Sequence, residues 1–480
     1  MAAPRIRAGR PRDRYMPTPT ARPGAADILT LGFGTAALMW TVGYACRLFG
    51  PAVPAPLMFA LLLAGLLAGG FAAGRYTTRG VRGGIYAGLL AGTIDLLMIA
   101  SLIGGQTPHE IKHGALLWIP GTLLVSVALA ALGAALARPR RDLLTDPPDW
   151  PGLFAAIAPC ATVVLLAAGG LVTGFDEGLA VVDWPNTEGY NMFLYPLARM
   201  TGGVYLEHAH RLLGSLVGLT TLALALHTQF TDRRRWLKAL AWLALALVIV
   251  QGILGGLRVT GRFTLSTRPA DTDPKILLAI VHGVFGQIVF AVLVVVAICR
   301  SRRFIAVTPQ AATASVGTDR AFGWALLVIL IAQLVLGALV RHFSWALDIL
   351  RYGLPVDPAK LIAIGRWALT LHTTIAVLVV LLAVAVGIRA WGLYRHVPVL
   401  RRLGSTLLFL AGLQLIFGVV ALIVSANNSV LRRPTAPDVA ITTAHQVIGA
   451  ALLACTVMLL VWNYRLLAPP PLAPTAPHPR

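Results

Sequence analysis

Four histidines recur at a fixed spacing through the last two thirds of the chain, and each stands near the start of an apolar run. His210 precedes His372 by 162 residues, and His282 precedes His445 by 163. Paired imidazoles inside an apolar helix bundle are ligands that suit a haem iron. The duplication therefore predicts two haem sites, one on His210 and His282 and one on His372 and His445.

Long apolar runs divide the chain into predicted membrane helices. The 480 residues are 57% hydrophobic and 12% charged, which is typical of a polytopic membrane protein. Each run has about 20 residues, enough to cross a bilayer as a helix. We therefore predict an all-α fold class with about 12 transmembrane helices. The predicted spans are 28–48, 55–74, 84–104, 114–137, 152–173, 204–229, 239–259, 276–299, 321–341, 367–390, 404–425 and 440–464.

Positive charge alternates between the connections. The net charge is +21, and the arginines gather in the N-terminal tail and in every second connection after it. Since such loops stay in the cytoplasm, we predict cytoplasmic termini and histidines in the outer half of a membrane, most simply a bacterial plasma membrane. No basic face with interleaved aromatic residues appears, so lipid, and not nucleic acid, is the predicted surrounding.

The repeat also predicts how the chain is divided. A Gln-x-x-x-Gly pattern recurs in helices between the histidine helices, where glycine would admit a flat ring or merely close helix packing. Its members are Gln251 and Gly255, Gln333 and Gly337, and Gln414 and Gly418. The predicted parts are a disordered tail (1–26), a four-helix module (27–140), a first four-helix bundle (150–303), a second four-helix bundle (320–465) and a tail (466–480).

Glu207 is the one glutamate of four that falls in a predicted span. It precedes His210 by three residues, so the two share a helix face. An intramembrane carboxylate is costly and usually functional, and beside a haem edge it could move protons. The alternative is a structural ion pair with Arg211 near the helix end.

Three arginines fall in or beside the outer loops, against the charge bias. Arg258, Arg341 and Arg366 would suit haem propionates, because guanidinium groups bind carboxylates well. Snorkelling toward the membrane interface is the alternative reading.

Three other groups of polar or metal-binding residues lie outside the histidine repeat. The segment His109–His113 matches the HExxH pattern of zinc proteases, but no third ligand follows it. Asp95, in the middle of the third span, predicts either a functional site or a bond to a neighbouring helix. The four cysteines are scattered and form no metal quartet.

Residues 171–219 resemble the first outer loop and following helix of the haem A synthase family. The resemblance rests on Asp183-Trp184-Pro185, on Glu207-x-x-His210-Arg211 and on the single histidines that open three later helices, and it covers about residues 150–465. It implies oxidation of a methyl group of haem O to the formyl group of haem A by two successive hydroxylations. The product would serve haem-copper oxidases.

The same resemblance implies roles for residues. Haem O would bind as substrate near His210 and His282, with Glu207 as the catalytic carboxylate. A resident haem b on His372 and His445 would relay electrons. Trp184 and Arg211 would contact haem, and a haem O synthase and an electron donor would be the partners.

The chain departs from the family in two ways. Many members carry a cysteine pair in the first outer loop, whereas residues 174–203 contain no cysteine. The first four spans have no counterpart in the family's common core.

Two other functions remain open at this stage. A di-haem b electron-transfer protein would use the same histidines but would need neither Glu207 nor the Asp-Trp-Pro loop. A duplicated transporter is disfavoured, because transporters often have inverted repeats with midplane sites, whereas these two four-helix copies share one orientation.

Overall fold

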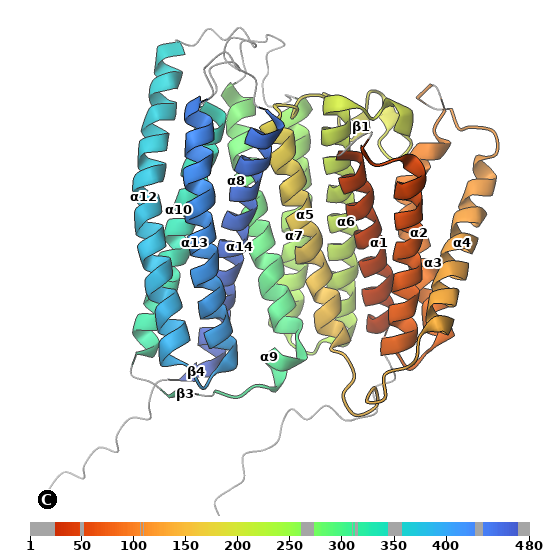
Figure 1. Ribbon diagram of the computed structural model, residues 1–480, viewed down its shortest axis with the longest axis horizontal. Helices are drawn as coiled ribbons and strands as arrows, with labels where there is room; N and C mark the ends of the chain where they lie inside the picture. Colours follow the sequence, from red (N-terminus) through yellow and green to blue (C-terminus); the bar gives the residue numbers. More distant parts are fainter. Residues whose placement is uncertain are drawn as a thin grey trace, which may run out of the picture.

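The computed structural model confirms an all-α membrane protein. It describes residues 25–48, 52–105, 107–108, 110–260, 273–309, 311–312, 315–343, 358–427 and 435–468. In these ranges twelve helices are long and apolar enough to cross a membrane, which matches the predicted number. The helices run roughly parallel to one another, and the helix bundles lie side by side in a row (Figure 1).

The helices follow the predicted spans closely. The first four are α1 (Ala26–Leu48), α2 (Ala55–Tyr76), α3 (Val81–Ile103) and α4 (Ala115–Leu136). The next four are α5 (Trp150–Gly174), α6 (Gly202–Thr231), α7 (Arg235–Thr260) and α8 (Asp273–Arg300). The last four are α10 (Val316–Phe343), α12 (Pro358–Leu393), α13 (Pro398–Asn427) and α14 (Ala436–Leu466). Short elements are β1 (Asn186–Thr187), β2 (Tyr190–Asn191), a 3₁₀ turn (Leu197–Arg199), α9 (Arg302–Ala306), β3 (Ala311–Ala312) and β4 (Leu467–Ala468).

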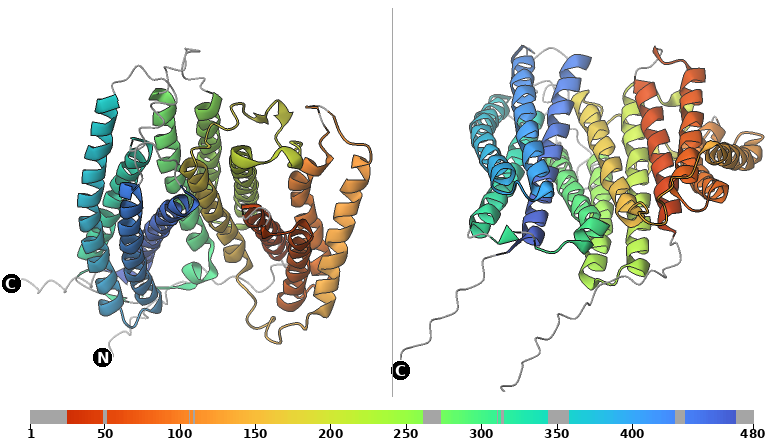
Figure 2. Two further views of the ribbon diagram at one scale, coloured as in Figure 1. Left: turned by 45° about the horizontal axis from the view of Figure 1, so that its top comes forward. Right: turned by 60° about the horizontal axis from the view of Figure 1, so that its bottom comes forward.

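Packing joins the helices in three groups of four. Helix α5 packs on α6 and α8, and α7 packs on both of these, which closes the first bundle. Helices α10, α12, α13 and α14 form the second bundle in the same cyclic order. The bundles meet where α14 packs on α5 and α8 and α10 packs on α8, while α1 joins the first four helices to α5 (Figure 2).

Small residues hold the first four helices together. A Cβ on Gly70 of α2 would lie 2.0 Å from the Ala130 carbonyl oxygen of α4, and one on Gly88 of α3 would lie 2.6 Å from the Ser126 carbonyl oxygen. Only glycine lets two helix backbones approach so closely. Such close packing associates helices in a membrane, where the surrounding lipid is apolar and the hydrophobic effect does not drive helices together. These four helices therefore form a tightly packed unit, termed the N-terminal module below.

Buried ion pairs lie at the end of the bundles away from the histidines. In the first bundle Asp232, just after α6, accepts hydrogen bonds from Arg234 and from Arg300 of α8, each at 2.7–2.8 Å. Burial alone would raise the pKa of Asp232, but these hydrogen bonds outweigh it and hold the pKa below its ordinary value. The carboxylate therefore stays ionised and locks α6 to α8.

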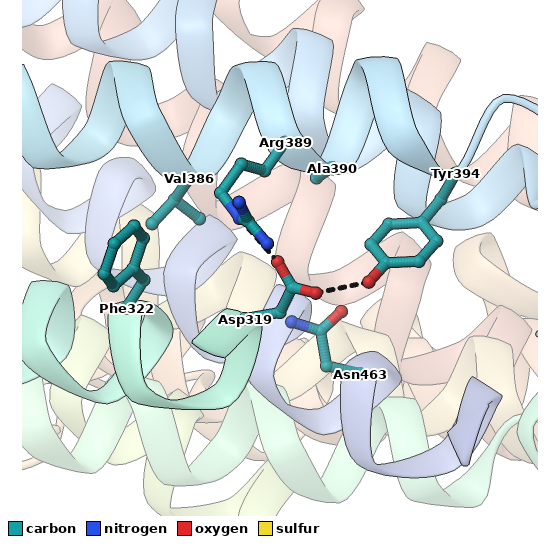
Figure 3. A pocket seen from close by; sticks show the side chains of 7 residues that line it. All are labelled: Asp319, Phe322, Val386, Arg389, Ala390, Tyr394 and Asn463. Carbon is teal, nitrogen blue, oxygen red and sulfur yellow. Dashed lines mark hydrogen bonds and ion pairs between the residues drawn. The ribbon is translucent and has the colours of Figure 1, made fainter. Parts of the chain in front are cut away.

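The second bundle has a corresponding cluster. Asp319 of α10 accepts hydrogen bonds from Arg389 of α12, at 2.7 Å, and from Tyr394, beside a hollow of about 10 Å³ that Asn463 of α14 also lines (Figure 3). That volume suits about one water molecule. Both clusters join the ends of three or four chain segments, so they fix the spacing of the histidine-bearing helices.

The predicted tails fall largely outside the described residues, which begin at residue 25 and end at 468. At the start of the predicted C-terminal tail, Leu467 and Ala468 form β4, which pairs in parallel with Ala311 and Ala312 of β3. This pairing ties the end of α14 to the connection between the two bundles.

Candidate functional site

The four repeated histidines face each other in the two pairs that the repeat predicts. The ring centroids of His210 and His282 lie 6.5 Å apart at an interplanar angle of 77°. Those of His372 and His445 lie 6.4 Å apart at 77°. Each pair joins the second and fourth helices of its bundle. The duplication therefore extends from sequence spacing to the orientation of the rings.

Each histidine ring packs over a glycine of the preceding helix. A Cβ built on Gly255 would lie 3.0 Å from Cε1 of His282, and one on Gly418 would lie 3.1 Å from Cε1 of His445. Gly169 and Gly337 stand in the same way beneath His210 and His372, at 3.0 and 3.1 Å. Any side chain at these positions would push the ring aside. The Gln-x-x-x-Gly pattern thus predicted three of the four glycines.

Gly169 was missed because its copy of the pattern has Leu165 where the others have glutamine. The glutamines bind the next helix: Gln251 Nε2 donates to the His282 carbonyl at 2.9 Å, and Gln333 Nε2 donates to the His372 carbonyl at 2.8 Å. Gln414 Nε2 lies 3.3 Å from Nε2 of His445. These glutamine side chains therefore position the histidine helices. A glycine that only packs under a histidine ring would not do this.

The nitrogen atoms of the four rings differ in their surroundings. Every Nδ1 is buried and has no hydrogen-bond partner among the described residues. Each ring also lies near a backbone group of the preceding helix, at Leu165, Gln251, Gln333 and Gln414 respectively. A neutral imidazole keeps one lone-pair nitrogen that can bind a metal ion.

These features fit a metal ion between the two rings of each pair. With metal–nitrogen bonds of about 2 Å and about 1 Å from each nitrogen to its ring centre, the two centroids would lie about 6 Å apart. The observed separations are close to that value. Within the described ranges no group of three or more His, Cys, Asp or Glu side chains could hold a metal ion. Two imidazoles alone suit an ion whose other ligands come from a macrocycle.

Glu207 lies buried at the start of α6 and is fully hydrogen-bonded. Its Oε1 accepts from Arg211 Nη2 at 2.7 Å, and its Oε2 accepts from the Val181 backbone N–H at 3.1 Å. The structure therefore contains the ion pair that the sequence offered as the alternative to catalysis. Catalysis by Glu207 stays a prediction, and such a role requires one of these bonds to open.

Arg211 fastens the loop between α5 and α6, residues 175–201, which we call the first loop. Its Nη1 donates to the carbonyls of Asp183 and Asn186 at 2.7 and 2.8 Å, and its Nη2 donates to Val181 and Glu207. All four Nη hydrogens are used, which leaves only Nε–H for a haem propionate. Arg211 therefore acts on the site chiefly by positioning the first loop.

Two of the other residues predicted to contact haem, Trp184 and Arg258, lie beside the first histidine pair. The indole of Trp184 packs on α7, where a Cβ on Gly256 would lie 2.4 Å from it, next to the glycine beneath His282. The Arg258 guanidinium lies against Gly178 of the first loop and is near enough to influence His210 and His282 electrostatically. Both residues thus border the first pair.

The remaining two arginines lie elsewhere. Arg341 of α10 donates to the Thr173 carbonyl at the end of α5, at 2.8 Å, and so spans the two bundles. Arg366 is exposed on α12, six residues before His372. Haem contacts by these two stay predictions.

The first loop contains a polar network that the sequence did not predict. His208 is fully buried, and its Nδ1 lies 3.0 Å from the Thr187 hydroxyl. Tyr195 packs on the His208 ring and donates to Glu188 at 2.7 Å. Burial and that hydrogen bond raise the pKa of Tyr195, so it remains a donor. The only sequence signal was that His208 lies two residues from His210 and must point elsewhere.

One helix separates the two pairs. On α5, Gly169 contacts the His210 ring, and the next residue, Gly170, approaches Thr443 and Gln446 of α14 at 2.8 and 3.1 Å from its built Cβ. Gln446 is adjacent to His445 in the chain. Consecutive glycines therefore bring the two sites to either side of a single helix backbone.

Neither hollow found in the described ranges is a haem site. The hollow beside Asp319 lies at the opposite end of the second bundle and is too small. An open hollow of about 480 Å³ is lined by Thr373, Val377 and Leu381 of α12 with two neighbours. These positions lie on the helix face away from His372, because 5 and 9 residues correspond to about half-turn offsets at 3.6 residues per turn.

The sequence also singled out Asp95 and the HExxH match, both in the N-terminal module. Asp95 Oδ1 accepts a hydrogen bond from Trp40 of α1 at 2.9 Å, the interhelix bond that the sequence offered as one alternative. His109 of the HExxH match lies outside the described residues. Glu110 of that match accepts a hydrogen bond from the Thr107 backbone N–H at 3.1 Å, and His113 is exposed.

Comparison with known proteins adds one finding. The family model COX15-CtaA, described as "Cytochrome oxidase assembly protein", matches residues 188–457. That range runs from the first loop to the middle of α14 and contains all four histidines. No curated protein matches the chain.

Proposed function

The chain belongs to the COX15-CtaA family of cytochrome oxidase assembly proteins, and on that premise we propose that it is a haem A synthase. Its reaction would oxidise a methyl group of haem O to the formyl group of haem A. The observation that carries the proposal is the repeated pair of histidines, whose ring separation would fit an iron held between them. A carboxylate, that of Glu207, lies beside one pair only.

The two pairs would have different tasks. Glu207 and the first loop stand beside His210 and His282, whereas Leu369 takes the corresponding place three residues before His372. We assign haem O, as substrate, to the first pair and a resident haem b to the second. A bound haem b supplies reversible one-electron transfer. Gly169 and Gly170 would keep the two groups close enough for electrons to pass between them.

The chain's own residues would hold and shield the substrate. The rings of the first pair are set by Gly169 and Gly255 and would orient the porphyrin. Arg258 would bind a propionate, because its guanidinium already lies between the first loop and the pair. Glu207, once released from one partner, would accept or return a proton at its Oε2 atom.

A di-haem b electron-transfer protein is the second candidate, and one observation favours it. Both oxygens of Glu207 are engaged by Arg211 and Val181, as a purely structural carboxylate would be. The two functions predict different products but the same resident haem spectrum.

The test is to extract haems from cells that make haem O, with and without the chain. Haem A should appear only with the chain, and the purified protein should show the absorption bands of low-spin six-coordinate haem b. Haem-loaded protein that yields no haem A would establish the second candidate instead. Colourless protein from a haem-replete host would refute both.

Glu207→Gln tests the carboxylate separately. The amide keeps the acceptor for Val181 but loses the charge, so conversion should stop while the resident haem remains. Glu188→Gln is the matched control, since this exposed carboxylate lies in the first loop, outside α6, and its amide oxygen can still accept from Tyr195. Equal conversion by the two variants would remove Glu207 from the mechanism.

A further inference from the structure

The first loop has no covalent cross-link of its own, yet it is ordered by contacts from outside its bundle. It contains no cysteine, and its regular structure is a six-residue hairpin, in which Asn186 pairs with Asn191 and Thr187 with Tyr190, and a 3₁₀ turn. So short a hairpin is at best marginally stable alone. Arg211 holds the first half of the loop, and the N-terminal module holds the second half.

Arg47 and Tyr44, in the last turns of α1, supply part of that support. Arg47 Nη2 donates to the Met200 carbonyl at 2.8 Å, and its guanidinium lies 5.3 Å from the Tyr205 ring centroid. The Tyr205 hydroxyl donates to the Tyr44 carbonyl at 2.8 Å, and the two tyrosine rings stack with centroids 5.9 Å apart. Helix α1 thus holds the end of the first loop and the start of α6.

The end of α3 supplies the rest. A Cβ on Gly104 would lie 1.9 Å from the Leu194 carbonyl oxygen, so the backbones of α3 and the first loop are in direct contact. Phe193 of the loop packs against the hydrophobic cluster to which Trp40 of α1 and Ile94 of α3 belong. The contacts come from two helices of the N-terminal module and reach the second half of the loop, at Phe193, Leu194 and Met200.

The first half of the same loop borders the first histidine pair, and the hairpin of β1 and β2 joins it to the half that the N-terminal module holds. Arg211 binds the carbonyls of Val181, Asp183 and Asn186, and through Arg211 the loop is connected to Glu207. Loop position and Glu207 position are therefore coupled by one guanidinium group. A displacement of the loop would disturb the carboxylate before it disturbed the second bundle.

We propose that the N-terminal module is a non-covalent brace that holds the first loop against the first histidine pair, with Gly104, Arg47 and Tyr44 as its positioning residues. The brace rests on these contacts alone, and only its effect on haem O conversion depends on the proposed function.

Gly104→Ala tests the brace with a single methyl group. Gly104 has φ −61° and ψ 136°, which alanine also adopts, so the backbone tolerates the change while the Leu194 carbonyl does not. Hydrogen–deuterium exchange of the full-length protein in nanodiscs should show the amides of residues 175–201 exchanging on the order of tenfold faster. Gly121→Ala is the matched control, because nothing lies within 4 Å of its built Cβ in the same module. It should leave loop exchange unchanged.

Arg47→Met gives a second, independent measurement should the alanine variant fail to fold. Loss of one net hydrogen bond of about 1 kcal/mol should speed loop exchange about fivefold. Arg47→Lys should largely restore protection, because an ammonium can still donate to the Met200 carbonyl. Arg79→Met, which breaks the 2.7 Å ion pair with Asp27 at the far end of the module, should not affect the loop.

Two results would overturn the brace. One is unchanged loop exchange in folded Gly104→Ala and Arg47→Met proteins. The other is equal loop exchange in Arg47→Met and Arg79→Met, which would mean that the loop only reports general stability of the module. A chain that shows the loop effect but converts no haem O would keep the brace and refute the proposed activity.

Discussion

The glycine beneath each histidine ring makes haem retention sensitive to one methyl group. At Gly418 the built Cβ lies 3.1 Å from Cε1 of His445, a few tenths of an ångström inside ordinary contact. Without haem the ring can rotate away from a new methyl group. With iron on Nε2 the ring is held, so the strain of Gly418→Ala should appear as weaker haem binding.

The expected size follows from the overpacking. Overpacking a close-packed site costs about 1–3 kcal/mol, whereas the higher helix propensity of alanine stabilises α13 with and without haem and therefore cancels. A loss of about 1–3 kcal/mol corresponds to haem binding weaker by about 5- to 150-fold. Gly418→Val, whose two methyl groups reach further toward the ring, should abolish six-coordinate binding to His445.

Gly412→Ala is the control, because it lies on the same helix with nothing within 4 Å of its built Cβ. The assay is haem titration of the purified protein, followed by the Soret band and by the low-spin α band. The expected order of haem affinity is wild type, equal to Gly412→Ala, then Gly418→Ala, then Gly418→Val. A Gly418→Val protein with an unchanged low-spin spectrum would refute the proposal that His445, packed on Gly418, holds a haem.

Three further outcomes follow from the same contacts. Because the pKa of Asp232 is held below its ordinary value, its ionised form stabilises the fold above pH about 4, and that stability is lost as the pH falls further. In Asp232→Asn the melting temperature measured between pH 3 and 7 should therefore fall less toward acid pH than in the wild type. An equal fall in both proteins would contradict this. Gly170→Val should separate α5 from Thr443 and slow electron transfer between the two haems in stopped-flow reduction, with both haems still bound; an unchanged rate would exclude this path. Asp95→Asn should preserve the acceptor for Trp40 and leave conversion unaltered, whereas lost conversion in a folded variant would give Asp95 a functional role.

The helices of this chain were predictable from the sequence because a membrane restricts the structures that can cross it. A helix must satisfy its own backbone in lipid, so an apolar run of about 20 residues permits few alternatives. The number of spans and their approximate bounds are therefore confirmed. The pairing of His210 with His282 and of His372 with His445 followed from duplication, since two copies of one fold place equivalent residues equivalently.

Interactions between segments distant in the chain were less predictable. Glu207 and Arg211 are neighbours on one helix, so their ion pair was foreseeable as an alternative, but the loop carbonyls that saturate Arg211 were not. Gly169 was invisible because its copy lacks the glutamine. His208 had no pattern at all, because the groups around it come from a loop without repeat or periodicity.

The sequence by itself determined the membrane class, the duplicated bundles, the four histidines and the family resemblance, because each is a local or periodic property of the chain. Only the tertiary structure decided which part of the chain the first four helices contact. The contacts of Arg47 with Met200 and of Gly104 with Leu194 join residues about 90 to 150 positions apart. No local pattern encodes such contacts, since they depend on how three bundles pack side by side.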